Sequence, residues 1–488
     1  MQRSYAAFLA TYPEYEHTRS LDALRASEYQ RLDANRHVYV DFTGAGLYGE
    51  SQVRRHLEQL ESQVYGNPHS GSPASDVTTQ LVERARRRVL EFFGASSRDF
   101  TAIFTANATA ALKLVGEAYP FAPGGRCLLT FDNHNSVNGI REFARRGGAA
   151  VAYAPLTTPD LGIDRVELDR LLEARPESEA PRLFAFPAQS NFSGVRHSLE
   201  IIRLARDRGW DVLLDAAAFV PTTRLDLDAL QPDFAAVSFY KMFGYPTGVG
   251  CLIARRTALA RLRRPWFAGG TINFATVQGR AHHLSPGEAG FEDGTLNFLS
   301  IPAVTIGLDW LDAAGLDVIS TRVRCLTGWL LSELLAFRHS NGRPLVRIYG
   351  PATTATRGAT VTFNLYDPEG HLLDYRRVEE LAAAEGISLR TGCFCNPGAG
   401  EAAEGLTEGD MLAGAADADI SLPRFRQLIE HRAGKSAGAI RVSFGLVSNF
   451  LDACRVRDCI GRFKDETRLT IGEVSFDIES CRVIRDGS

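Results

Sequence analysis

Short apolar segments alternate with amphipathic segments over the first 255 residues of the chain. This alternation predicts a mainly parallel β-sheet covered by helices on both faces. Between residues 79 and 94, apolar positions recur at helical spacing and arginines fill the opposite face, which predicts a structural helix. The expected strands are VYVDF (38–42), TAIFT (101–105), CLLTF (127–131), AAVAYAP (149–155), RLFAFPA (182–188), DVLLDA (211–216), FAAVSF (234–239) and VGCLIAR (249–255).

The pattern changes near residue 300, where longer helical segments begin, and a mixed set of helices and strands follows. Three late segments predict a small antiparallel sheet: VRIYG (346–350), ATVTFNLYD (359–367) and AIRVSFGL (439–446). We therefore expect a helical arm at 1–37 that packs with a small domain, a large α/β domain at 38–299 and a small α+β C-terminal domain at 300–488.

Composition excludes several classes of function. The chain has 488 residues, 45% of them hydrophobic and 23% charged, with a formal net charge of -4, so we expect no large basic face for nucleic acid. No apolar run approaches the roughly 20 residues that span a bilayer, and no signal peptide is recognisable. Eight cysteines, mostly in apolar contexts, indicate reduced thiols. We expect a cytoplasmic protein without membrane or nucleic-acid partners.

A lysine and an aspartate follow two of the expected strands. Lys241 stands at the end of one strand and before a glycine-rich loop, while Asp215 ends the preceding strand. In an α/β sheet both side chains emerge at the carboxyl edge, where ligands bind. An amine and a carboxylate in one pocket are what pyridoxal phosphate requires, since the lysine forms the imine and the aspartate keeps the pyridine nitrogen protonated. Taken alone, a lysine at a turn is also compatible with simple solvation.

Further polar residues follow other strands. The small residues 106–109 lie between a strand and a helix, where free backbone N–H groups could bind a phosphate, although a plain helix cap has the same pattern. Ser238, three residues before Lys241, is a further candidate phosphate ligand. His134 could lie flat on a cofactor ring or be a solvated loop histidine. Asn191 could donate to the ring's phenolic oxygen or simply form a turn.

The stretch RTGCFCNPGAGE, residues 390–401, places Cys393 and Cys395 one residue apart. A metal clip normally needs four ligands in paired spacings, and no second pair is present, so we expect no metal. A disulfide between residues so close would be strained. The glycines of this stretch indicate a mobile thiol, with Arg390 as a candidate cation to favour the thiolate. These glycines are Gly392, Gly398 and Gly400.

Six ordered segments carry a resemblance to a known family. They are FTANATAALKLV, DNHNSVNGIREF, FPAQSNFSG, LLDAAAF, VSFYKMFGYPTGVG and RTGCFCNPG. Together they resemble the class V aminotransferase-like family of fold-type I pyridoxal phosphate enzymes. They are most similar to the N-terminal, cysteine-desulfurase-like part of molybdenum cofactor sulfurases. The resemblance covers nearly the whole chain and implies a large domain with a mostly parallel sheet and a smaller α+β domain.

The resemblance implies roles for the residues that match the family's motifs. Lys241 is similar to its Schiff-base lysine, Asp215 to its pyridinium partner, His134 to the residue stacked on the ring and Asn191 to the residue near the ring oxygen. The positions similar to phosphate ligands are Ala108, Thr109 and Ser238, together with Thr295, which matches a threonine reaching the phosphate from a neighbouring subunit. A homodimer is therefore implied.

The resemblance also implies how a substrate is held. Arg441 is similar to the arginine that binds the substrate carboxylate, although a solvent-facing strand residue would have the same sequence context. Arg390 is expected beside it. Cys395 is similar to the acceptor thiol of the family, whereas Cys393 could support it, relay sulfur or be buried.

The implied activity is a cysteine desulfurase: sulfur passes from L-cysteine to Cys395 as a persulfide and alanine leaves. The alternatives are a C–S lyase, an epimerase or an aminotransferase acting on another amino acid. Ala218, Tyr240 and Gly400 replace a glutamine, a histidine and a cysteine found in many relatives, and the chain continues only briefly beyond the small domain. The sulfur acceptor is therefore expected to be another protein or a small molecule.

Overall fold

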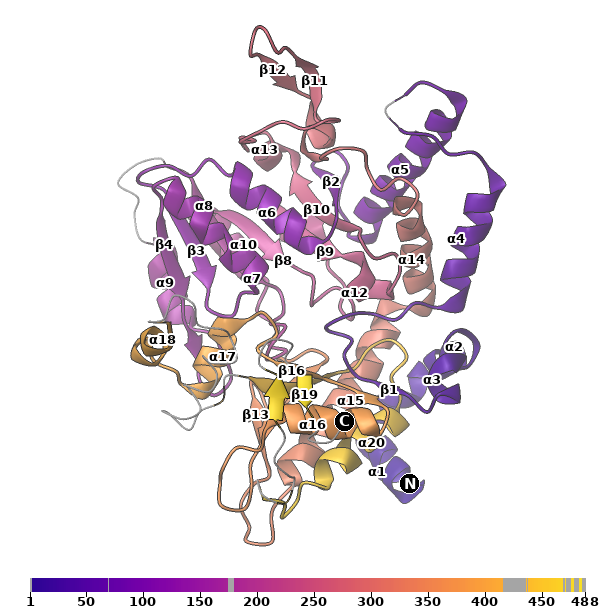
Figure 1. Cartoon of the computed structure of the whole chain (residues 1–488), viewed down its shortest axis with the longest axis vertical. Helices are drawn as coiled ribbons and strands as arrows, with labels where there is room; N and C mark the ends of the chain where they lie inside the picture. The colour runs from indigo at the N-terminus through magenta and orange to yellow at the C-terminus, as the bar shows by residue number, and fades with distance from the viewer. Residues whose placement is uncertain are drawn as a thin grey trace.

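A seven-stranded sheet forms the centre of the larger part of the protein, which we describe from a computed structural model (Figure 1). The structure describes residues 2–68, 70–173, 180–415, 436, 438–467, 470, 475–477 and 482–484. In spatial order the strands are β2 (Phe100–Thr105), β10 (Gly250–Arg255), β9 (Phe234–Ser238), β8 (Asp211–Asp215), β7 (Arg182–Pro187), β3 (Arg126–Thr130) and β4 (Ala150–Ala154).

Seven of the eight predicted strands are confirmed as members of this sheet. Only β10 runs antiparallel to its neighbours, because the short connection from β9 leaves no room for the crossover that a parallel pair needs. The expected strand 38–42 is different: only β1 (Val38–Tyr39) is a strand, and it pairs in parallel with β15 (Ile387–Ser388). The N-terminal segment therefore adds to the C-terminal part of the protein and not to the large sheet.

Helices cover both faces of the large sheet, as the sequence predicts (Figure 1). Successive side chains of one strand point to opposite faces: Phe184 and Phe186 join the core on one face, and Leu183 and Ala185 the core on the other. The helices of this part are α4 (Glu50–Ser62), α5 (Pro73–Phe92), α6 (Ala108–Ala118), α7 (Asn135–Asn138), α8 (Ile140–Arg146), α9 (Arg165–Glu173), α10 (Glu200–Asp207), α11 (Leu227–Leu230), α12 (Phe239–Phe243), α13 (Arg256–Leu259) and α14 (Ile301–Ala314).

The predicted small antiparallel sheet is also confirmed, with a fourth strand that the sequence did not indicate. Its order is β13 (Val346–Tyr349), β14 (Thr360–Leu365), β17 (Ala439–Ser443) and β16 (Arg390–Gly392). It lies below the large sheet in Figure 1. The helices of this region are α15 (Leu316–Ala336), α16 (Tyr375–Ala384), α17 (Pro397–Glu404), α18 (Glu408–Ala415) and α20 (Phe450–Gly461).

The first residues of the chain form a series of helices, which we call the arm. It contains α1 (Gln2–Thr11), the 3-10 helix η1 (Pro13–Thr18), α2 (Ser20–Glu28) and α3 (Gln30–Ala34). The arm packs on α15 and α20 through aromatic rings: the Phe8 centroid lies 4.5 Å from that of Phe450, which lies 4.8 Å from that of Trp329. Such ring pairs stabilise the contact beyond the area that they bury.

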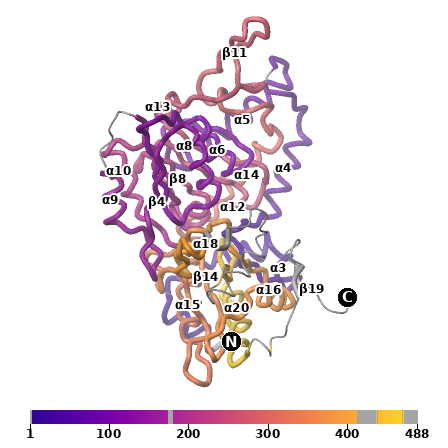
Figure 2. Tube along the Cα trace, turned by 60° about the vertical axis from the view of Figure 1, so that its left-hand side comes forward, coloured from indigo at the N-terminus to yellow at the C-terminus, as the bar shows by residue number. Residues whose placement is uncertain are grey.

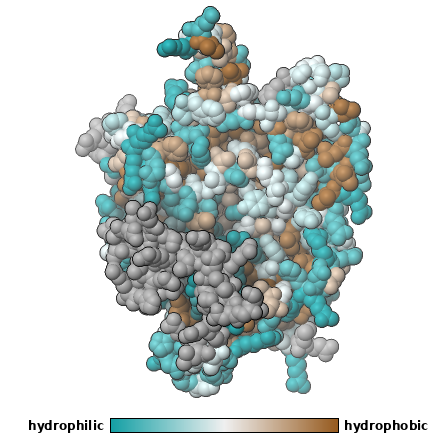
Figure 3. All heavy atoms as spheres, viewed as in Figure 1, coloured by the Kyte–Doolittle hydropathy of each residue, from teal (hydrophilic) through white to brown (hydrophobic). Residues whose placement is uncertain are grey.

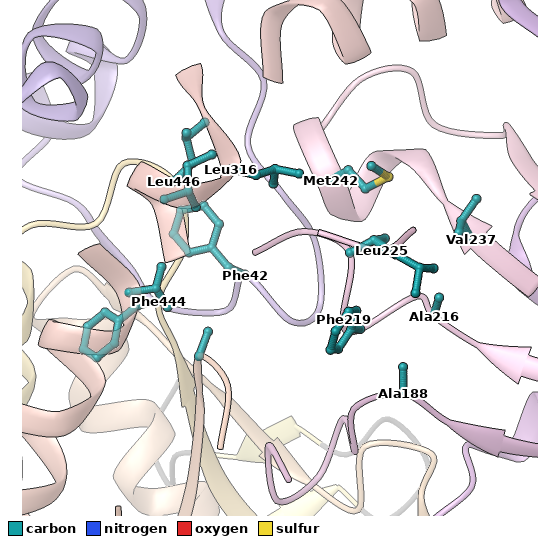
Figure 4. Packing of buried hydrophobic residues seen from close by; sticks show 14 of the residues in the cluster. Phe42, Ala188, Ala216, Phe219, Leu225, Val237, Met242, Leu316, Phe444 and Leu446 are labelled. Atoms are coloured by element: carbon teal, nitrogen blue, oxygen red, sulfur yellow. The ribbon is translucent and has the colours of Figure 1, made fainter. Parts of the chain in front are cut away.

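A strap at residues 43–47 joins the arm to the large sheet. The Gly46 N–H donates to the carbonyl of Tyr240 at 3.0 Å, and a Cβ on Gly46 would lie 2.8 Å from the carbonyl of Lys241. Figure 4 shows part of the buried apolar cluster, to which Phe42, Met242 and Phe444 contribute from three distant segments. Helix α12 thus contacts the strap through its backbone and joins the core through Met242.

Besides the β1–β15 pair, the described residues form three further two-stranded sheets. One of them, the hairpin of β11 (Ile272–Ala275) and β12 (His282–Leu284), projects from the end of the molecule opposite the N-terminus (Figures 1 and 2). The others are β5 (Leu156–Thr157) with β6 (Gly162–Ile163) and β18 (Ser475–Asp477) with β19 (Arg482–Ile484). None of the helices in the described ranges combines the length and the apolar character that crossing a bilayer requires.

The buried ion pair between Arg25 and Asp452 fastens the arm to α20, with Nη1 2.5 Å from Oδ2 and both side chains buried. We expect Arg25→Ala to lower the free energy of unfolding by about 3–5 kcal/mol, because it leaves the Asp452 carboxylate buried without its cation. Urea unfolding followed by circular dichroism measures this change. Arg98→Ala, which removes an exposed ion pair with Asp99, is the control and should leave the midpoint unchanged. Equal midpoints for both variants would contradict the role given to Arg25.

Candidate active site

The carboxyl ends of the parallel strands surround a cavity of about 200 Å³. Asp215 is the last residue of β8, Ser238 is the last residue of β9, and Lys241 follows in α12. Parallel strands bring their carboxyl ends to one edge of the sheet, and for that reason residues far apart in the sequence meet there. Seven predicted site residues line this one cavity: Ala108, Thr109, His134, Asn191, Asp215, Ser238 and Lys241.

The Lys241 amine lies in a poorly solvated position. Desolvation lowers the pKa of Lys241 from its ordinary value; the nearby Asp215 carboxylate opposes this, and the charges of Arg441 and Arg390 add to it. Asp215 is buried, and its Oδ1 accepts a hydrogen bond from the N–H of Ala217 at 3.0 Å. The site therefore presents an amine with an increased neutral fraction beside a fixed carboxylate.

His134 contributes a neutral imidazole. Burial lowers the pKa of His134 below its ordinary value, Asp215 opposes the shift, and the charges of Lys241 and Arg441 reinforce it. Nδ1 accepts a hydrogen bond from the N–H of Ser136 at 3.1 Å, so the proton of the neutral ring is on Nε2. The ring can therefore donate one hydrogen bond from Nε2.

The loop between β2 and α6 forms an anion cradle at one end of the cavity. The Asn107 side chain caps α6 by accepting from the N–H of Ala110 at 2.9 Å. The hydroxyl of Ser238 is buried without a hydrogen-bond partner among the described residues. A Cβ at Gly250 would lie 2.4 Å from the carbonyl carbon of Asn107, so glycine lets β10 approach this loop closely. A helix N-terminus with an unpaired hydroxyl suits a phosphate group.

Two arginines lie beside the cavity and share one carboxylate. Nη2 of Arg441 donates to Oδ1 of Asp41 at 2.7 Å, and Nε of Arg390 donates to Oδ2 of the same residue at 2.8 Å. The Arg441 side chain is only 3% exposed, whereas that of Arg390 is 51% exposed. Arg390 therefore binds Asp41, and the sequence-based expectation that it serves the cysteine thiol finds no support in this contact.

The cysteine loop is fastened to the cavity wall. Cys395 is exposed and Cys393 is half-buried. The carbonyl of Cys395 accepts from the N–H of Asn135 at 2.7 Å, and the carbonyl of Phe394 accepts from Nδ2 of Asn191 at 2.8 Å. Asn396 also donates to Oδ1 of Asn191 at 2.9 Å. The exposed Cys395 thus directly follows Phe394, whose carbonyl is bonded to the cavity-lining side chain of Asn191.

The backbone of this stretch is unusual at three residues. Gly392 has a φ of 108°, and Phe394 and Cys395 have φ values of 54° and 53° in the left-handed region. Gly398 and Gly400 lie within α17. A Cβ at Gly398 would lie 1.9 Å from the carbonyl oxygen of Phe131, so this glycine permits close packing. The mobility of the thiol stays a prediction.

Thr295 does not join the other site residues within one chain. It lines a different cavity of about 360 Å³ with Thr105, Ala106 and Lys113, on the other side of the loop that begins α6. Its hydroxyl accepts a hydrogen bond from Nδ2 of Asn67 at 3.4 Å.

Sequence reasoning missed Asp41 and Asn396. Asp41 follows the apolar run that begins at Val38, so the strand-end argument applied to Asp215 could have identified it. Asn396 precedes Pro397 in the cysteine stretch and caps α17, where its Oδ1 accepts from the N–H of Ala399 at 3.2 Å. Its side chain also donates to the carbonyl of Asp132 at 2.7 Å, a contact that no local pattern indicates.

A group of potential metal ligands lies in the turn after β14. Asp367, Glu369 and His371 place one ligand atom each within 4.8 Å of one another. The Asp367 carboxylate accepts hydrogen bonds from the N–H groups of Glu369 at 3.0 Å and of His371 at 2.8 Å. We interpret this group as the closure of a turn.

The chain is similar to known proteins over most of its length. It is 38% identical over 466 residues to molybdenum cofactor sulfurase from Solanum lycopersicum, covering 90% of this chain and 56% of that protein. For molybdenum cofactor sulfurase from Homo sapiens the identity is 37% over 473 residues, covering 92% and 52%. The chain thus spans little more than half the length of these relatives.

A solved structure confirms the α/β fold expected of the family. The apo structure of cysteine desulfurase from Thermococcus onnurineus NA1 superposes with a TM-score of 0.73 at 22% identity, covering 91% of this chain and 97% of that one. A family model described as aminotransferase class-V matches residues 38–450. Since this match takes in both sheets and every residue of the cavity, the protein belongs to the class-V aminotransferase family.

Proposed function

We propose that this protein is a pyridoxal phosphate-dependent cysteine desulfurase, which takes sulfur from L-cysteine onto Cys395 and releases alanine. The observation that carries the proposal is the meeting of Lys241 and Asp215 in one cavity, beneath a loop that exposes the Cys395 thiol. The names of the similar proteins, a molybdenum cofactor sulfurase and a cysteine desulfurase, support it.

The cavity residues fit pyridoxal phosphate. The unpartnered Ser238 hydroxyl, the N-terminus of α6 and Thr109 would hold the phosphate. Asp215 would keep the pyridine nitrogen protonated, and the Lys241 amine would bind the aldehyde carbon of the cofactor. When bound, this cofactor supplies an electron sink for chemistry at the α and β carbons of an amino acid.

The residues of the chain perform the remaining tasks. Arg441 would bind the substrate carboxylate, and its nearly complete burial makes that contact strong because little water competes for it. Lys241 would move the proton at the α carbon, a role that suits an amine whose neutral fraction is increased. His134 would contribute a neutral ring and a donor at Nε2.

Cys395 would accept the sulfur atom. Its thiolate forms a new S–S bond with the sulfur of L-cysteine while the Cβ–S bond of the substrate breaks. The electron pair of the broken bond goes to Cβ, which takes a proton to become the methyl group of alanine. The persulfide on the exposed Cys395 is then accessible to an acceptor, either another protein or a small molecule.

A homodimer would complete the site. Thr295 lies across the phosphate loop from the cavity of its own chain, so we propose that it serves the phosphate of a second copy. The projecting hairpin exposes apolar side chains, including Phe274 and Val277, and brown surface marks this projection in Figure 3. Exposed apolar surface of this kind favours an interface between proteins.

We also propose that the protein works in the cytoplasm. The seven described cysteines are all free, and five of them are buried. Free buried thiols are typical of a reducing compartment.

The role of Cys395 can be tested directly. Purified protein loaded with pyridoxal phosphate is incubated with L-cysteine and a reductant, and alanine, sulfide and pyruvate are measured. We expect alanine and sulfide in equal amounts, and a fall of about a hundredfold or more in turnover for Cys395→Ala, because the sulfur loses its acceptor. Cys393→Ala is the matched control and should retain turnover.

Other products would identify other reactions. Pyruvate in place of alanine, with unchanged turnover in Cys395→Ala, would overturn the proposal in favour of a C–S lyase. Transfer of the amino group or inversion at the α carbon, equally insensitive to Cys395, would indicate an aminotransferase or an epimerase of the same family.

The lowered pKa of Lys241 gives a second prediction. A lysine reacts with acetic anhydride only when it is neutral, so the labelling profile of Lys241 in the cofactor-free protein should lie at lower pH than in an unfolded peptide of the same segment. Competitive labelling with isotopic reagents, followed by mass spectrometry, measures both profiles. Coincident profiles would show that the folded site does not desolvate this amine.

A further inference from the structure

The carboxylate of Asp41 is the least expected charged group near the cavity. It lies between Arg390 and Arg441, with one oxygen for each guanidinium at 2.8 and 2.7 Å. The Asp41 side chain is only 9% exposed, so water screens these contacts weakly. Arg441, the proposed partner of the substrate carboxylate, is thus already paired with a carboxylate of the protein itself.

Arg441 nevertheless keeps a free donor. Its Nη2 binds Asp41 and its Nη1 donates to the carbonyl of Asn191 at 3.0 Å. Its Nε is buried and has no partner among the described residues. An unsatisfied buried donor is costly, and a ligand oxygen would remove that cost. Arg441 lies next to the cavity, because Asn191, whose carbonyl it binds, is one of the residues that line it.

The backbone around Asp41 is well anchored. The Ser443 N–H donates to the carbonyl of Val40 at 2.7 Å, and the Ser443 hydroxyl accepts from the N–H of Thr43 at 2.9 Å, so both flanks of Asp41 are bonded to β17. A Cβ at Gly44 would lie 2.5 Å from Oδ2 of Asp41, so the strap closely encloses the carboxylate. These contacts favour a substrate carboxylate that binds beside Asp41 and does not displace it.

Asp41, Arg390 and Arg441 together carry a net single positive charge, because the Asp41 carboxylate cancels one of the two guanidinium groups. Deeper in the cavity, desolvation lowers the pKa of Lys241 and the Asp215 carboxylate opposes this shift. Glu379, which acts on Arg390 from a distance, accepts a hydrogen bond from the Thr391 hydroxyl at 2.5 Å. His134 is neutral near pH 7 because its pKa is lowered. One substrate carboxylate neutralises this single positive charge, whereas a second carboxylate would have no cation to bind.

We propose that Asp41 is a specificity-determining residue, which neutralises one of the paired arginines so that the site accepts amino acids with one carboxylate and rejects those with two. The inference rests on the proposed function, since it assumes that Arg441 binds the substrate's carboxylate. It adds a residue that selects the substrate class through charge without itself touching the reacting atoms.

The test compares two ligands that differ in carboxylate number. L-alanine and L-aspartate are titrated into the protein loaded with pyridoxal phosphate, and dissociation constants are obtained by calorimetry and from the visible absorption of the cofactor. The wild type should prefer L-alanine. Asp41→Asn should shift the ratio of the two constants toward L-aspartate by about tenfold, because the arginine pair then carries two uncompensated charges.

Charge-matched variants separate this role from a structural one. The double variant Asp41→Asn with Arg390→Gln restores a net single charge and should return the ratio to within about threefold of the wild type. Arg390→Gln alone, at a half-exposed position, leaves Asp41 to cancel Arg441 and should weaken L-alanine binding by about tenfold. Asp317→Asn changes an exposed residue that does not line the cavity and should leave both constants unchanged.

The outcomes distinguish this inference from the proposed function. Suppose that the wild type converts L-cysteine to alanine. The role of Asp41 alone would then be overturned if Asp41→Asn leaves the ratio of the two dissociation constants unchanged, or if the double variant does not restore that ratio. Should Asp41→Asn fail to fold, undiminished L-alanine binding by Arg390→Gln would overturn that role equally. A wild type that binds neither amino acid overturns both. If the ratio of dissociation constants shifts as expected but L-cysteine gives no alanine, the selection by charge is supported and the desulfurase proposal is overturned.

Discussion

The amine of Lys241, held in a poorly solvated position at the end of β9, is the constraint around which the site is arranged. A desolvated ammonium is costly, so the surrounding chain must supply negative charge or favour the neutral form. Asp215 supplies charge from the neighbouring strand, and the paired arginines oppose it. The strap at 43–47 lies against the backbone of α12, and Gly46 allows that contact. The helix that carries this side chain thus also contacts the N-terminal segment through its backbone.

The sequence predicted those parts of the site that depend on the parallel sheet. Asp215, Ser238, Asn191 and His134 each follow a strand, and parallel strands place their carboxyl ends together whatever the distance between them in the sequence. The same geometry explains why the large sheet and its two helical layers could be anticipated from alternating apolar and amphipathic segments. The small sheet was anticipated only in part, because β16 has three residues and no distinct apolar pattern.

Other contacts could not be predicted because they depend on packing between distant segments. Asp41 meets Arg441 across 400 residues, and β1 pairs with β15 although its apolar pattern is equally suited to the large sheet. The close approach of Gly398 to the carbonyl oxygen of Phe131 is another such contact, because the local sequence does not indicate which distant segment a glycine packs against.

The long sequence separation of the Asp41–Arg441 contact also bears on how the protein is made. A chain emerging from the ribosome exposes Asp41 early and presents Arg441 only after another 400 residues have been synthesised. Until then β16 lacks its neighbour β17, and the carboxylate has no buried cation to bind. Domains generally complete their cores as units during synthesis, so a prematurely terminated product would contain the large sheet yet no finished pocket. The contact between Asp41 and Arg441 therefore forms late in synthesis, after the large sheet is complete.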